Sequence, residues 1–160
     1  MKNSVFGLLV IVFTLFSCQP ETIDVPQEEV GIFNSKIVSI VDGDARFTAD
    51  YDQVLAAAAE IPALQENDAT PYEANIEEID GKYYLRILSS GGYGTNIELV
   101  QDPTNPGVFS GGPIACSSSA CNNCCGCVPN GDKCSECMQV ASDCRKVNIG
   151  GGSGPGPVPF

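Results

Sequence analysis

The chain has 160 residues, and its 20 acidic and 8 basic side chains give a formal net charge of −12. This balance argues against a nucleic-acid partner, because such partners are bound by clustered Lys and Arg. The chain contains no histidine, which removes the commonest general base and a common metal ligand. No nucleophile and base stand at a recognisable spacing, so we expect no catalytic residues and favour a non-enzymatic protein.

The N-terminus combines a basic residue with a short apolar segment. Lys2 precedes residues 5–16, VFGLLVIVFTLF. This run is shorter than the about 20 residues that a membrane-spanning helix needs. A short apolar run behind a basic start is typical of the core of a signal peptide.

The end of this segment, Leu15-Phe16-Ser17-Cys18, resembles the lipobox of bacterial lipoprotein signal peptides, although that family usually has a small residue in place of Phe16. The resemblance implies removal of residues 1–17, a diacylglycerol thioether on Cys18 and an N-acyl chain, which together anchor a protein firmly. In the family, an Asp after the Cys often marks retention in the inner membrane. Gln19 therefore favours the outer membrane, on its periplasmic or surface face. We expect no other cofactor.

The mature chain divides by composition into four parts. Residues 18–30 are acidic and contain two prolines, which is typical of an extended tether. Residues 31–115 have the alternation of a small folded domain. Residues 116–144 hold the cysteines, and residues 145–160 are rich in Gly and Pro, which predicts a disordered tail.

Two Asp-Gly pairs predict hairpins in the 31–115 domain. Asp42-Gly43 and Asp80-Gly81 each separate two runs with β-branched or alternating apolar side chains. Gly111-Gly112 weakens the last expected strand. The expected strands are 36–41, 45–48, 75–79, 82–88, 95–101 and 108–114.

One segment has the pattern of a helix. Residues 50–61 begin with Asp50 as a possible N-cap, contain four consecutive alanines and end before Pro62. Their apolar residues recur at helical spacing on one face. We therefore expect an α+β fold, with one amphipathic helix packed on a small antiparallel meander sheet, followed by a disulfide-rich loop region and a disordered tail.

Eight cysteines remain once Cys18 is assigned to lipid, and all fall within residues 116–144. In an exported protein this density predicts four disulfides that stabilise a loop-rich knob, whose pairing the sequence leaves open. The expected disulfide cysteines are Cys116, Cys121, Cys124, Cys125, Cys127, Cys134, Cys137 and Cys144.

The same cysteines allow other interpretations. Two CxxC pairs, Cys121 with Cys124 and Cys134 with Cys137, have a zinc-like spacing. Either pair also suits thiol exchange. An iron–sulfur cluster fits poorly, because Val128 precedes Pro129, whereas a ferredoxin run has a cysteine directly before its proline.

Three weaker candidate sites lie in the 31–115 domain. Asp42, Asp44, Asp50 and Asp52 suit calcium, although turn and capping roles explain two of them. Glu77, Glu78 and Asp80 offer paired carboxylates for glycoside chemistry, although the two adjacent glutamates would point to opposite faces of a strand. A tyrosine group suits a glycan or peptide contact, although packing explains it more simply: Tyr83, Tyr84 and Tyr93.

The overall layout resembles short cysteine-rich exported lipoproteins of the Bacteroidetes group, which mostly have no assigned function. This resemblance transfers no functional residues. The sequence favours a membrane-anchored, non-enzymatic binding or structural accessory module of the cell envelope, with an envelope protein or a glycan as partner. The alternative is a metal-binding or thiol-redox protein that uses the cysteines of residues 116–144.

Overall fold

The computed structural model describes residues 30–121, 127–135 and 143–150, and strands account for 49% of them. The expected α+β class is therefore wrong, since the fold is mostly β. Within these ranges α1 (Tyr51–Ala59) is the one helix of seven residues or more. The shorter helices are η1 (Val30–Asn34), α2 (Pro62–Gln65) and η2 (Ser90–Gly92). No helix in the described ranges is long and apolar enough to cross a membrane.

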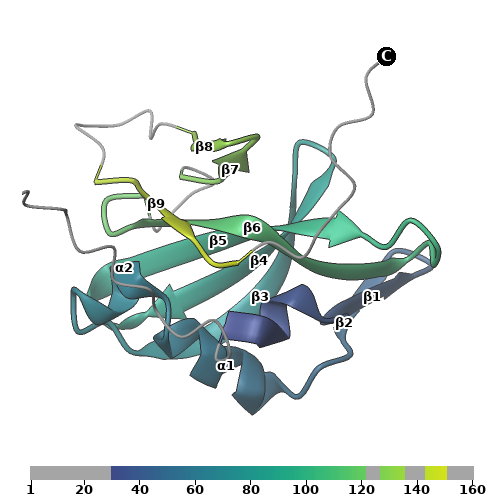
Figure 1. Ribbon diagram of the computed structural model, residues 1–160, viewed down its shortest axis with the longest axis horizontal. Coiled ribbons are helices and arrows are strands. Elements are labelled where there is room, and N and C mark those ends of the chain that lie inside the picture. The colour runs from purple at the N-terminus through teal and green to yellow at the C-terminus, as the bar shows by residue number, and fades with distance from the viewer. Residues whose placement is uncertain (1–29, 122–126, 136–142, 151–160) are drawn as a thin grey trace, which may run out of the picture.

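Seven strands form one antiparallel sheet in the order β2-β1-β6-β5-β4-β3, with β9 paired to β6 beside this path. The sheet curls into a nearly closed, barrel-like shape, with α1 and α2 on one side and the separate β7-β8 pair on the other (Figure 1). The strands are β1 (Val38–Val41), β2 (Asp44–Phe47), β3 (Pro71–Ile79), β4 (Lys82–Ser89), β5 (Tyr93–Gln101), β6 (Val108–Ser118), β7 (Pro129–Asn130), β8 (Lys133–Cys134) and β9 (Arg145–Asn148).

Both predicted Asp-Gly hairpins are confirmed. Asp42 and Gly43 join β1 to β2, and Asp80 and Gly81 join β3 to β4, with all four residues at positive φ. Two consecutive residues at positive φ match the twist of the flanking strands, and Asp followed by Gly adopts this conformation readily.

The predicted helix is confirmed, with Asp50 as its N-cap. The Asp50 carboxylate accepts a hydrogen bond from the Gln53 amide at 3.0 Å. α1 ends at Ala59, and Pro62 starts α2 at a position where its missing N–H costs nothing. The buried face of α1 packs into the main core together with Leu85 and Ile87 of β4.

Strand β6 is longer than its glycines predict, and runs through them to Ser118. A Cβ on Gly111 would lie 3.0 Å from the Cβ of Phe33, a fully buried side chain of η1. The glycine is therefore needed for close packing and does not end the strand. As a result, Cys116 lies inside the main sheet, not in a separate knob.

The predicted disordered tail is wrong for its first residues. β9 (Arg145–Asn148) pairs with the second half of β6, and Ile149 is buried in the main core. Val147 and Ile149 alternate along this segment and pack into or against the main core. Residues 151–160 lie outside the described ranges, as do the predicted signal peptide, Cys18 and most of the predicted tether.

Gly107 and Gly43 provide a matched test of the fold. Both have φ near +90°, but a Cβ on Gly107 would lie 2.8 Å from the Ile40 carbonyl oxygen, whereas a Cβ on Gly43 meets nothing within 4 Å. Gly43→Ala should cost about 1 kcal/mol of unfolding free energy from backbone strain alone. Gly107→Ala should cost about 1–3 kcal/mol more, because the carbonyl must shift. Urea unfolding of the oxidised protein measures both, and equal losses would contradict this packing.

Candidate functional site

The described cysteines lie on and beside the sheet face opposite α1. Residues 127–135, here called the cover segment, contain β7 and β8 and lie over this face (Figure 1). The Tyr84 hydroxyl donates a hydrogen bond to the Pro129 carbonyl at 3.4 Å, and the Asn96 side-chain amide donates to the Cys127 carbonyl at 3.2 Å. Since Tyr84 and Leu85 are adjacent on β4, they point to opposite faces, one toward the cover segment and one toward the main core.

Two disulfides hold the cover segment to the sheet. Cys134 of β8 is bonded to Cys116 of β6, with a Cα–Cα distance of 5.7 Å. Cys127, at the start of the cover segment, is bonded to Cys144, which directly precedes β9, at 5.5 Å. Each bond therefore joins the cover segment to the sheet or its immediate flank, so that this region is stapled in place and is not an independent knob.

The predicted disulfide role is shown for part of the cysteine set. Besides the four cysteines of the two pairs, Cys121 is also disulfide-bonded. Cys124, Cys125 and Cys137 lie outside the described ranges. Of the zinc ligands suggested by the CxxC spacing, Cys121 and Cys134 are both in disulfides, so neither offers a thiolate in this state.

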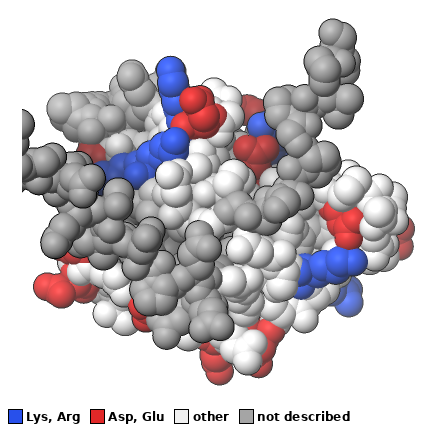
Figure 2. Space-filling view, viewed as in Figure 1, with Lys and Arg blue, Asp and Glu red and all other residues white. Residues whose placement is uncertain are grey.

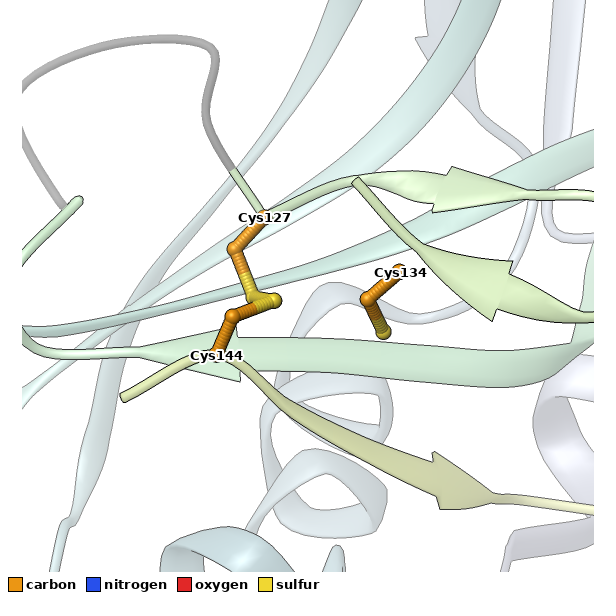
Figure 3. A group of neighbouring side chains, drawn as sticks. All are labelled: Cys127, Cys134 and Cys144. Atoms are coloured by element: carbon orange, nitrogen blue, oxygen red, sulfur yellow. A yellow bond between two sulfur atoms is a disulfide. The ribbon is translucent and has the colours of Figure 1, made fainter. Parts of the chain in front are cut away.

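Three sulfur atoms from the two staples lie close together. The Sγ atoms of Cys127, Cys134 and Cys144 are all within 4.8 Å of one another (Figure 3). The sequence reasoning missed this group because it followed the CxxC spacing, and Cys144 is ten residues away from Cys134. The triad could hold a soft metal ion only after both disulfides were reduced.

Asp143 fixes the position of Cys144 from the neighbouring residue. Its carboxylate accepts hydrogen bonds from the Ser118 hydroxyl, from the Ser119 hydroxyl at 2.6 Å and from the Ser119 amide at 2.7 Å. Partial burial raises the pKa of Asp143, but these hydrogen bonds and that of the Ala120 amide outweigh it and lower the pKa to about 2. No sequence motif pointed to Asp143, although serines at 117–119 are typical donors to a carboxylate.

Charged pairs border the covered face. Arg86 of β4, whose side chain is 8% exposed, pairs with Glu77 of β3 at 3.2 Å, and Lys82 pairs with Glu98 of β5 at 2.8 Å. The hydrogen bond to Glu98 raises the pKa of Lys82, and burial raises the pKa of Tyr84. These groups fix strand neighbours to one another and are consistent with a structural role.

The other sequence candidates occupy structural positions. Asp42 lies in the first hairpin turn, Asp44 pairs with Arg46 at 3.5 Å, and Asp50 caps α1, so three of the four possible calcium ligands have local roles. Of the tyrosine group, Tyr84 is buried, and Tyr83 and Tyr93 pack against the main core. Glu77 faces Arg86 across the strand pair, which explains its position without a catalytic partner.

No family model, no curated protein and no solved structure matches the chain in comparisons with known proteins.

Asp143→Asn should loosen the junction between β6 and Cys144. Above about pH 4 the wild-type carboxylate accepts hydrogen bonds from four donor groups. The side-chain amide of the Asn variant should accept fewer and weaker hydrogen bonds, so we expect a loss on the order of 2 kcal/mol of unfolding free energy. Because the folded pKa of Asp143 is lowered to about 2, this stabilisation should disappear as the pH falls from about 4 to about 2. Thermal unfolding across this range measures the difference, with the exposed Asp132→Asn as control. A difference that did not depend on pH would contradict the assignment.

The two staples should act together on the cover segment. We expect amide exchange of residues 127–135 to rise about tenfold or more when both pairs are replaced by serine, because the segment then loses both covalent links. Removal of one pair alone should have a smaller effect. The β3-β4 hairpin should be unchanged in all variants. Equal protection of residues 127–135 with and without the disulfides, measured by hydrogen–deuterium exchange, would refute the stapled arrangement.

Proposed function

We propose that the chain is an exported, lipid-anchored module of the cell envelope that binds or supports another envelope component without catalysis. The observation that carries the proposal is the pair of disulfides Cys116–Cys134 and Cys127–Cys144. Structural disulfides form and persist mainly outside the reducing cytoplasm. The lipobox resemblance at Cys18 accounts for the same compartment by an independent feature of the chain.

The anchor and the folded body are separated by a short acidic segment. The described structure begins at Val30, twelve residues after Cys18. A chain of this length spans at most about 40 Å when fully extended. The folded body would thus stay close to the membrane to which the lipid holds it, within reach of other envelope proteins or glycans.

The surface of the body suits a solvated accessory module. On the face shown in Figure 2, Lys and Arg atoms lie beside Asp and Glu atoms, with uncharged surface between these groups. Such a mixed face shows no broad patch of one sign, although the whole chain carries a net charge of −12, which favours solubility. It supports a partner recognised at short range, such as a protein surface or a glycan.

Cys18→Ser tests the anchor. The variant should move from the membrane fraction to the soluble fraction and lose incorporation of labelled fatty acid, because the thioether needs the Cys18 sulfur. Cys134→Ser is the matched control, since it removes a cysteine of the cover segment and should leave the protein in the membrane. Retention of Cys18→Ser in the membrane fraction with fatty acid still attached would contradict the proposal.

A thiol count separates this proposal from the metal-binding alternative. Denatured without reductant, the isolated wild-type protein should react with almost no maleimide, because the cysteines are blocked by lipid or disulfides. Release of zinc together with reactive thiols would instead favour a metal site in residues 116–144.

A further inference from the structure

The Sγ atoms of Cys127, Cys134 and Cys144 place the two disulfides directly beside each other. Cys134 is bonded to Cys116, yet its Sγ lies within 4.8 Å of both sulfurs of the Cys127–Cys144 bond. Figure 3 shows the Cys134 side chain next to that bond, on the neighbouring strand of the cover segment. A thiolate attacks a disulfide by approaching one of its sulfurs, so a small side-chain movement would bring Cys134 into reach of its neighbour.

The four sulfur-bearing residues differ in access to water. Cys116 and Cys127 are 0% and 1% exposed, whereas Cys134 and Cys144 are partly exposed. In each staple the partly exposed residue, Cys134 or Cys144, is therefore the one that lies nearer to an external thiol. Since burial disfavours a charged thiolate, a thiolate on Cys144 is also more stable than one on Cys127.

We propose that Cys127, Cys134 and Cys144 form a thiol–disulfide exchange site whose substrate is an external dithiol. One sulfur of the dithiol attacks the Cys134 sulfur, and the released Cys116 sulfur takes up a proton and becomes a buried thiol. The second sulfur of the dithiol then attacks the first, closes the dithiol into its own disulfide and releases Cys134 as a thiolate, so that two electrons pass to the protein. Cys134 then attacks the Cys127 sulfur, forms a Cys127–Cys134 disulfide and releases the Cys144 thiolate. This second step needs no further oxidant or reductant, because one disulfide is exchanged for another.

The exchange site does not depend on the proposed envelope function, since it rests on sulfur positions and access alone. The exchange transfers the free thiolate from Cys134 in the cover segment to Cys144, which directly precedes β9. If the two disulfides served only to hold the cover segment in place, they would not need to lie close to each other.

The variant Cys116→Ser tests the second step in the full exported chain. It leaves Cys134 without its partner and directly beside the Cys127–Cys144 bond. The protein is isolated without thiols, trapped with N-ethylmaleimide and mapped by mass spectrometry of its peptides. We expect a disulfide joining Cys134 to Cys127 and maleimide on Cys144 in at least about a tenth of the molecules, because the two pairings differ little in free energy.

The double variant Cys116→Ser/Cys134→Ser is the control, because it removes the attacking sulfur. Its Cys127–Cys144 bond should remain closed and unlabelled. Label on Cys144 in this control would overturn the proposal, since exchange would then not require Cys134. Label confined to Cys134 in Cys116→Ser, with the Cys127–Cys144 bond intact, would also overturn it.

The wild-type chain tests the first step with dithiothreitol as the dithiol. Limiting amounts should produce protein with thiols on Cys116 and Cys144 and the new Cys127–Cys134 bond. Thiols that appear only as the original pairs, Cys116 with Cys134 or Cys127 with Cys144, would show that the two staples open independently and would refute the exchange.

Discussion

The two disulfides between the cover segment and the sheet are the constraint on which the whole covered face of the sheet depends. One face of the sheet is covered by α1 and η1 through a hydrophobic core that includes Phe33, Leu85 and Ile87. The other face is covered by a segment with few large apolar side chains, and the contacts that hold it include two hydrogen bonds and two covalent bonds. Closing loops of 18 and 17 residues contributes about 3 kcal/mol each, which is large beside the net stability of a small domain.

Strand β6 connects these two halves of the structure. Its first part pairs with β1 and receives Phe33 against Gly111, and its second part pairs with β9 and carries Cys116. β5 lies along its other edge. The main core, the covered face and the C-terminal strand thus meet on one strand, and Asp143 adds hydrogen bonds at its end. A change in β6 should for this reason affect both faces of the sheet.

Local features of the fold were predictable from the sequence, and long-range ones were not. Asp-Gly turns and the Asp50 cap depend on neighbouring residues, and both are confirmed. The length of β6 depends on Phe33, which needs a glycine at a distant position, and β9 depends on a free edge of β6 that only the folded sheet provides. The α+β assignment failed on such long-range pairings. It gave too much weight to one helix and too little to strands interrupted by glycine or placed next to a Gly-rich segment.

The same distinction applies to the candidate site. The even number of cysteines in residues 116–144 pointed to disulfides, but the pairing is set by which strands lie side by side. The CxxC spacing drew attention to Cys121 and Cys134 as zinc ligands, whereas the fold places Cys134 next to Cys127 and Cys144. Asp143 had no signal of its own, because its partners are serines more than twenty residues away along the chain.

Disulfide mapping of the isolated, oxidised protein tests the central claim most directly. The protein is alkylated, digested without reductant, and its cross-linked peptides are identified by mass spectrometry. The structure predicts peptides that join Cys116 to Cys134 and Cys127 to Cys144. Alkylated Cys116 and Cys144, with neither residue found in a cross-linked peptide, would show that the cover segment is not stapled to the sheet.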